Sequence, residues 1–216
     1  MPESTSSLSP SAAQPPERHP ARSVFLNCPY DPEYEPLFDT LIFTVVCCGF
    51  TPRSATDSGT VAESRMERIF SAIFDSNYSI HDLSRCQGEG EQMLARFNMP
   101  LELGIAMTRR RATGEASERH DWLVVVPKDA PYARFVSDLA GFDLTKYDGT
   151  PESLVRRVMS WLVTRPGAFQ GVSPPAVIEK LQAFRKSKAE LKFQWGDMIP
   201  WKDLVGAATK HAPAAG

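Results

Sequence analysis

The run "WLVVVP", Trp122 to Pro127, places five apolar residues in succession and then a proline. A short apolar run of this kind is typical of a strand that is buried on both faces, because a half-exposed strand would alternate polar and apolar residues. Strands buried on both faces belong to parallel sheets that are covered by helices. The stretch therefore predicts an α/β fold, and the rest of the chain should supply more strands and the helices between them.

Other segments on both sides of this run fit that expectation. Short strands are predicted at "SVFLN", "FTPRSA" and "YSIHDLS", with a weaker one at "FDLTKY". Between them, helical spacing appears in "PLFDTLIFTVVCCG", "VAESRMERIFSAIF", "RFNMPLELGIAM", "YARFVSDLAG" and "SLVRRVMSWLV". This alternation predicts right-handed crossovers and a flavodoxin-like (Rossmann-like) parallel sheet of four or five strands, with helices on both faces.

The composition divides the chain into three parts. Residues 1–21 are rich in Ser and Pro and poor in large apolar residues, which predicts a disordered N-terminal tail. Residues 22–165 hold the alternating strands and helices of the α/β domain. Residues 174–210, which begin with two prolines, are expected to form a C-terminal helical appendage that either packs on the core or contacts a partner or another copy through Trp195 and Trp201. We expect both tryptophans to be at least partly buried.

The overall composition excludes several classes of function. The 216 residues carry a net charge of −2, and the pI is near 6.1, so the chain has no basic excess to attract nucleic acid or anionic lipid. No apolar stretch approaches the roughly 20 residues of a membrane span, so we expect a cytoplasmic protein. The four cysteines show no CxxC spacing, and the sequence predicts neither a metal site nor a bound cofactor.

Polar residues follow the first and third predicted strands. In a flavodoxin-like sheet these two strands are neighbours, and ligands bind in the crevice at their carboxyl ends. The first loop supplies Asn27, Cys28, Pro29 and Tyr30, and the second supplies Asp82, Ser84 and Arg85. We therefore expect "NCPYD" and "HDLSR" to face each other and to form a binding site.

The segment "RFNMPLELGIAM", Arg96 to Met107, places a carboxylate near the start of the next helix. We expect Glu102 in the first helical turn, either as an ordinary helix-start charge or as the reactive group of a site. Gly104 suggests a close approach to this helix. Asn98 and Met99, just before the carboxylate, are expected to line the substrate site.

Two arginines are further candidates for substrate binding. Arg53 and Arg85 lie near predicted strand ends, where a guanidinium could hold phosphate with two hydrogen bonds. Pairing with nearby acidic residues at the surface explains them equally well.

The segments "VFLNCPYD", "YSIHDLS" and "LELGIA" together resemble the nucleoside 2-deoxyribosyltransferase family and, more loosely, the Toll/interleukin-1 receptor (TIR) class of NAD-cleaving domains. The resemblance covers roughly residues 23–162. It implies that Glu102 is the catalytic carboxylate at the anomeric carbon and that Asp82 orients the ribose or base. The first loop, "NCPYD", departs from the small, glycine-containing loop of the transferases.

The resemblance leaves three functions open. The first is cleavage of the N-glycosidic bond of a nucleotide, with NAD as substrate, release of nicotinamide, cyclic or linear ADP-ribose as product, and a role in bacterial antiviral defence. The second is deoxyribosyl transfer in nucleoside salvage. The third is a nucleotide-binding sensor without catalysis. The first function also predicts activation by a homo-oligomer or a partner protein through the C-terminal appendage.

Overall fold

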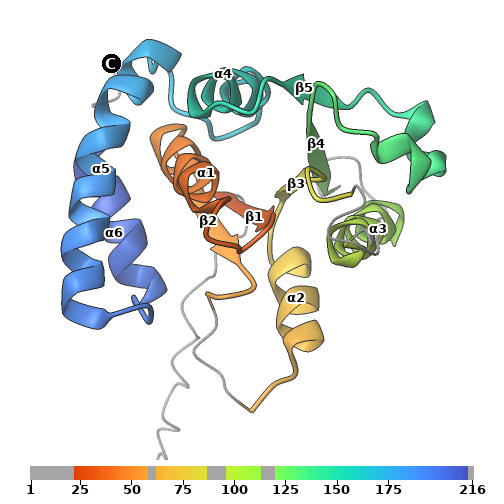
Figure 1. Cartoon of the computed structure of the whole chain (residues 1–216), viewed down its shortest axis with the longest axis horizontal. Coiled ribbons are helices and arrows are strands. Elements are labelled where there is room, and N and C mark those ends of the chain that lie inside the picture. The colour runs from red at the N-terminus through yellow and green to blue at the C-terminus, as the bar shows by residue number, and fades with distance from the viewer. Residues whose placement is uncertain (1–21, 58–61, 87–95, 113–119, 214–216) are drawn as a thin grey trace, which may run out of the picture.

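The computed structural model describes residues 22–57, 62–86, 96–112 and 120–213, so the expected tail at 1–21 lies outside the described residues. Five parallel strands form one sheet in the order β2-β1-β3-β4-β5, as the sequence predicted (Figure 1). This is the flavodoxin-like order. The strands are β1 (Ser23–Asn27), β2 (Thr51–Ser54), β3 (Tyr78–Asp82), β4 (Asp121–Pro127) and β5 (Thr145–Tyr147).

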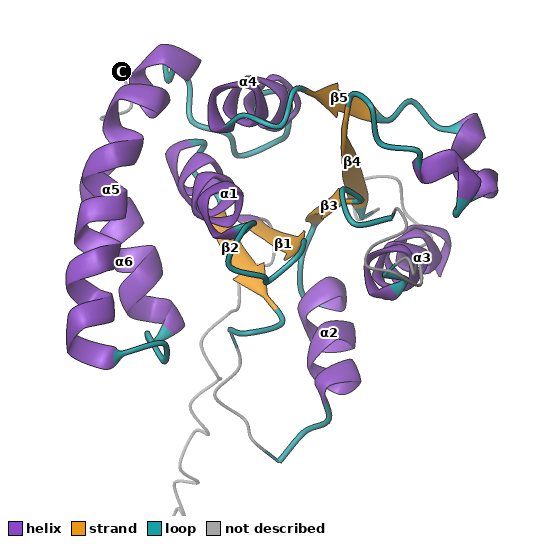
Figure 2. Ribbon diagram, in the orientation of Figure 1, coloured by secondary structure: helices purple, strands orange, loops and turns teal. Residues whose placement is uncertain are grey.

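Helices cover both faces of this sheet (Figure 2). Helices α1 and α4 lie on one face, and α2 and α3 lie on the other. The α-helices of the described residues are α1 (Glu35–Cys47), α2 (Arg65–Phe74), α3 (Asn98–Ala112), α4 (Pro151–Leu162), α5 (Pro174–Trp195) and α6 (Trp201–His211). Helix α2 begins with a capping box in which Ser64 and Glu67 bond each other's backbone N–H groups.

The place of β4 between two layers of helices explains why residues 122–127 are all apolar. Leu123 and Val125 pack with α1 and α4, whereas Val124 and Val126 pack with α3 on the opposite face. Successive side chains of a strand point to opposite faces, so a strand covered on both sides needs apolar residues at every position.

One predicted helix is wrong. In place of a helix over "YARFVSDLAG", the chain forms two short 3-10 helices, Tyr132–Arg134 and Ser137–Gly141, separated by Phe135 and Val136. Leu139 is buried, but Tyr132, Phe135 and Val136 stay partly exposed. So short a segment gains little from burial, and helix nucleation is costly without it.

Helix α1 ends in a Schellman motif that requires glycine. Phe50 N–H donates to Val45 O at 3.1 Å and Gly49 N–H donates to Val46 O at 2.9 Å, while Gly49 has a φ of 88°. A Cβ at Gly49 would lie 2.7 Å from the ring of Phe169. Glycine at position 49 therefore ends the helix without backbone strain, and the turn also lets Phe169 approach closely.

The C-terminal helices α5 and α6 pack beside α1 and extend the main apolar core (Figure 1). Phe184 stacks on Phe43 of α1 with ring centroids 5.3 Å apart. Trp201 is half-buried, and its indole N–H donates to Pro52 O on the edge strand β2 at 3.1 Å. Trp195 keeps 51% of its surface exposed. Among the described helices, none combines the length and the hydrophobicity of a membrane span.

Candidate functional site

The carboxyl ends of β1 and β3 lie side by side, as the strand order predicted. Asn27, the last residue of β1, pairs in register with His81, and Asp82 follows at the end of β3. The two loops also meet: the Arg85 guanidinium lies 2.8 Å from the Asp31 carboxylate, and the Tyr34 hydroxyl donates to Asp82 at 2.7 Å. The prediction that "NCPYD" and "HDLSR" face each other is confirmed.

Glu102 lies on α3, but not in its first turn. The helix begins at Asn98, which places Glu102 one turn further in, so the expected first-turn position is wrong. The free N–H groups of a helix start act mainly within the first turn, and they stabilise Glu102 less than expected. Gly104 also differs from expectation, because a Cβ there would point into open space away from the buried face.

The carboxylate of Glu102 is buried and has little compensation. Its residue is only 5% exposed, and within the described part of the chain no hydrogen bond to its side chain is made. Burial raises the pKa of Glu102 to about 7, and the positive charge of Arg65 opposes this shift. A carboxyl group that is half-ionised near neutral pH is suited to acid–base or electrostatic catalysis.

Arg65 and Tyr30 stand beside this carboxylate. Arg65, the first residue of α2, places its guanidinium 5.9 Å from the centre of the Tyr30 ring, within the range of a cation–π contact. The Tyr30 hydroxyl lies 3.1 Å from the Ser54 hydroxyl and donates to Leu26 O at 3.3 Å. The phenol group is thus held by β1 and β2, and its ring is left 39% exposed at the edge of the site.

Asn27 joins the end of β1 to the start of α3. Its amide nitrogen donates to Met99 O at 2.8 Å and to His81 Nδ1 at 2.8 Å. Because the second bond makes Nδ1 an acceptor, the proton of His81 is on Nε2, which donates to Ser79 Oγ at 2.7 Å. Asn27 therefore fixes the turn of α3 that leads to Glu102.

The hydrogen-bonded chain continues through the interior of the molecule. Ser79 Oγ lies 2.8 Å from His120 Nε2, and His120 Nδ1 lies 2.8 Å from Ser76 O. Burial lowers the pKa of His81 to about 3 and that of His120 to about 4, so both rings are neutral at pH 7. The chain is a rigid support for Asn27 and carries no charge.

Asp82 is fully buried, and its carboxylate is bound by three donors. Oδ2 accepts from the hydroxyls of Tyr34 at 2.7 Å and Tyr147 at 3.0 Å, and Oδ1 accepts from the backbone N–H of Ser84 at 2.7 Å. Burial raises the pKa of Asp82, and these hydrogen bonds oppose the rise. Through these bonds Asp82, at the end of β3, is linked to Tyr34 in the segment after β1 and to Tyr147 at the end of β5.

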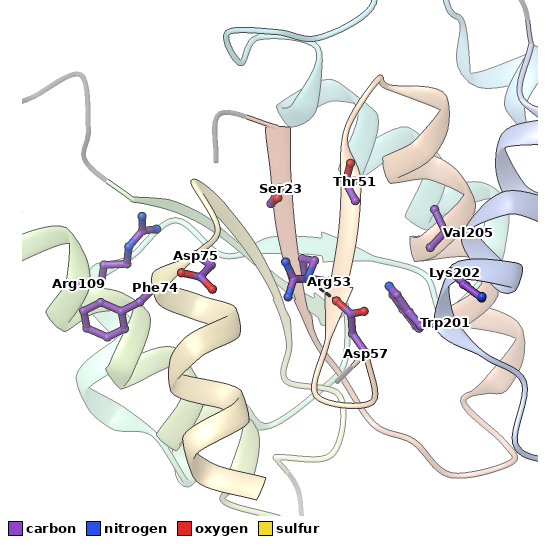
Figure 3. Close-up of a pocket in the computed structure, with 10 residues that line it drawn as sticks. All are labelled: Ser23, Thr51, Arg53, Asp57, Phe74, Asp75, Arg109, Trp201, Lys202 and Val205. Carbon is purple, nitrogen blue, oxygen red and sulfur yellow. Dashed lines mark hydrogen bonds and ion pairs between the residues drawn. The ribbon is translucent and has the colours of Figure 1, made fainter. Parts of the chain in front are cut away.

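The two candidate arginines lie in different places. Arg85 is bound by Asp31 and Glu33 in the loop after β1 and belongs to the switch-point edge. Arg53 is ion-paired with Asp57 and lies in a separate hollow of about 850 Å³ between α2 and α6 (Figure 3). Ser23 and Thr51, the first residues of β1 and β2, line that hollow, so Arg53 is not grouped with Glu102.

The other predicted residues surround this edge to different degrees. Cys28, Pro29 and Met99 are buried, Ser84 is partly exposed, and Asn98 is exposed at the start of α3. Burial, and next the charges of Asp82 and Glu102, raise the pKa of the Cys28 thiol, so this cysteine is a neutral part of the site wall.

Sequence reasoning missed Arg65, Tyr34 and Tyr147. Arg65 follows the Ser64 cap, and its place at the start of the helix after β2 puts it at the carboxyl edge of the sheet. That position could have been found from the capping box alone. The two tyrosines gave no such signal, because their shared contact with Asp82 spans 48 and 65 residues.

The described residues contain no cluster of His, Cys, Asp or Glu with the geometry of a metal site. No protein-family model matches the chain, and no curated protein is similar enough to it to indicate a relationship.

Proposed function

We propose that the protein is an enzyme that cleaves the N-glycosidic bond of a nucleotide, with NAD as substrate and Glu102 as the catalytic carboxylate. The observation that carries this proposal is the buried Glu102 carboxyl, which has a pKa of about 7 and lies at the switch point of a flavodoxin-like sheet. The resemblance of "LELGIA" and "YSIHDLS" to nucleoside deoxyribosyltransferases and NAD-cleaving TIR domains indicates the bond that is attacked.

The chemistry needs a negative charge near the anomeric carbon. As the C1′–N bond of the nicotinamide riboside breaks, its electron pair goes to the ring nitrogen and leaves an oxocarbenium-like sugar. Ionised Glu102 offsets that positive charge, and the low-dielectric surroundings strengthen the interaction. Water then adds to the anomeric carbon and loses a proton, which gives ADP-ribose.

The neighbouring residues support this assignment. The Asn27 amide and the histidine chain hold the start of α3, so the position of Glu102 is fixed before a ligand binds. Arg65 favours the ionised form of Glu102. Tyr30 offers an aromatic ring at the rim of the same site.

The proposal is tested with Glu102→Gln, which keeps the size of the side chain and removes its charge. The purified chain and the variant are incubated with NAD, and nicotinamide is followed by chromatography. We expect the variant to release nicotinamide at least about 100-fold more slowly, since removal of one preorganised electrostatic group costs about 3–4 kcal/mol in the transition state. Glu190→Gln, on an exposed position of α5, is the matched control and should behave as the wild type.

A second incubation, with a deoxynucleoside and a free base, separates this proposal from deoxyribosyl transfer. Base exchange without nicotinamide release would move the activity to nucleoside salvage. Release that is equally fast in both proteins would remove Glu102 from the mechanism. If NAD binds and neither protein forms a product, as a monomer or an oligomer, the site is that of a sensor.

A further inference from the structure

A hollow of about 340 Å³ lies next to this site, between the loop after β1 and the C-terminal helices. Pro29 to Pro32 form one wall, and α5, α6 and the turn between them form the other. Tyr30 lines the hollow and also interacts with Arg65 and Glu102, so one ring joins the hollow to the candidate site.

Three aromatic rings in succession line this hollow. Tyr30 and Phe38 meet edge to face with centroids 5.3 Å apart, and Phe38 and Trp201 lie 6.2 Å apart with 32° between their planes. The polar ends of the outer two rings are already bonded, Tyr30 to Ser54 and Leu26 and Trp201 to Pro52. Their orientation is fixed in advance, which lowers the entropy that a ligand loses on stacking there.

The two ammonium groups at the hollow are already paired with three carboxylates. Lys188 lies 2.8 Å from Glu35 and 2.5 Å from Asp39, and Lys192 lies 3.4 Å from Asp197 and 3.8 Å from Glu35. A phosphate would have to break these pairs, whereas an uncharged ring would not. The hollow is also near the lower end of the roughly 300–1,000 Å³ of small-molecule pockets, which suits one ring system better than a whole dinucleotide.

We propose that this hollow is a subsite for a flat, uncharged heteroaromatic base, formed jointly by Tyr30, Phe38 and Trp201. The inference rests on the proposed function for the identity of the ligand, because NAD supplies such bases. Adenine is uncharged in NAD itself, and the nicotinamide ring, a cation while its glycosidic bond is intact, becomes uncharged on release. It gives the C-terminal helices a direct part in substrate binding, since without α6 the hollow would lose the Trp201 wall.

Two variants test the subsite in the Glu102→Gln background, in which NAD would persist. Trp201→Leu removes the stacking ring, and Ile199→Trp fills the hollow and leaves its three aromatic rings in place. Met198→Trp is the matched control, because the neighbouring side chain is 83% exposed and does not line the hollow. Binding of NAD, adenosine, nicotinamide and ribose 5-phosphate is measured by titration calorimetry, and circular dichroism checks the fold.

We expect both variants to weaken NAD binding at least ten-fold, while Met198→Trp binds NAD normally. The same loss with adenosine identifies the adenine base, and the same loss with nicotinamide identifies the pyridine base. Ribose 5-phosphate, which has no base, should not distinguish the variants. The subsite would be overturned if NAD, adenosine and nicotinamide all bound normally to folded Trp201→Leu and Ile199→Trp. It would also be overturned if none of the three bound to the parent protein.

Turnover measured in proteins that keep Glu102 separates this inference from the proposed function. If the chain releases nicotinamide and Ile199→Trp leaves KM unchanged, the proposed function stands and the subsite is wrong. If no NAD is consumed, but adenosine binds to the parent protein and this binding is lost in both variants, the subsite stands and the proposed reaction is wrong.

Discussion

Glu102 carries a stability cost that follows from its burial. A carboxyl whose pKa is raised on folding takes up a proton more readily in the folded state, so its contribution to stability is lost as the pH rises through the folded pKa. For Glu102 that window runs from the ordinary value of 4.5 to about 7.

We therefore expect Glu102→Gln to raise the free energy of unfolding by about 2–3 kcal/mol at pH 8.5 and to change it little at pH 4.5. At low pH the wild-type carboxyl is protonated and resembles the amide. Urea unfolding at the two pH values measures the difference. A variant that is equally or less stable than the wild type at pH 8.5 would show that the ionised carboxylate is compensated in the fold.

The same pKa sets the pH dependence of the proposed reaction. Because the ionised form offsets the developing charge, kcat/KM, which reports the pKa of the free enzyme, should rise with pH through about 7 and level off above it. Steady-state rates of nicotinamide release between pH 5.5 and 9 measure this profile. A rate that falls over this range would assign Glu102 the role of a proton donor.

For single residues, the sequence predicted the position in the fold better than the contacts that each side chain makes. Asn27, Asp82 and Glu102 were expected at one edge because strand order alone brings them there. The three donors around Asp82 were not foreseen, because Tyr34 and Tyr147 reach it only after β1, β3 and β5 have assembled. Burial of Glu102 likewise depends on how α2 and α3 pack, which no local pattern records.

Strands were easier to predict than the connections between them. The bounds of β1 agree with "SVFLN" because a doubly covered strand must be apolar and its polar loop ends it. The segment between β4 and β5 has helical spacing as well, but its backbone is decided by how much of it the sheet can bury. Spacing alone does not contain that information.

Strand β3 also contributes the hydrogen-bonded chain that holds Asn27, and Ser79 lies between the two histidines of that chain. We expect Ser79→Ala to lower the free energy of unfolding by about 2–4 kcal/mol, because His81 and His120 would each keep a buried ring nitrogen without a partner. Ser160→Ala, on the exposed side of α4, is the control and should change it by less than about 0.5 kcal/mol. Equal stability of the two variants in urea would mean that water or a shift of the rings replaces Ser79.

At the scale of the whole molecule, the C-terminal helices and the α/β domain share one core. Val177, Leu181 and Phe184 of α5 belong to the same buried cluster as the inward face of α1. The division at residues 165 and 174 in the sequence is therefore a change in composition and not a break in packing.

This shared core predicts how the chain unfolds. Phe184→Ala should cost about 3–5 kcal/mol because it leaves a cavity against Phe43, and unfolding should remain a single transition. Phe193→Ala is a control on the same helix, since that side chain is 93% exposed. Calorimetry and far-UV circular dichroism measure both properties. Separate transitions for the helices and the sheet would show that α5 and α6 are an independent unit.

The contact between Trp201 and Pro52 has a consequence for assembly. Pro52 has no amide hydrogen to offer on the outer side of β2, and its carbonyl oxygen already accepts from the indole. An incoming strand would find neither a donor nor a vacant acceptor at this position, so fibril-like growth by strand addition is blocked at this margin. A high local concentration of the chain therefore does not turn the β2 edge of its sheet into a template for aggregation.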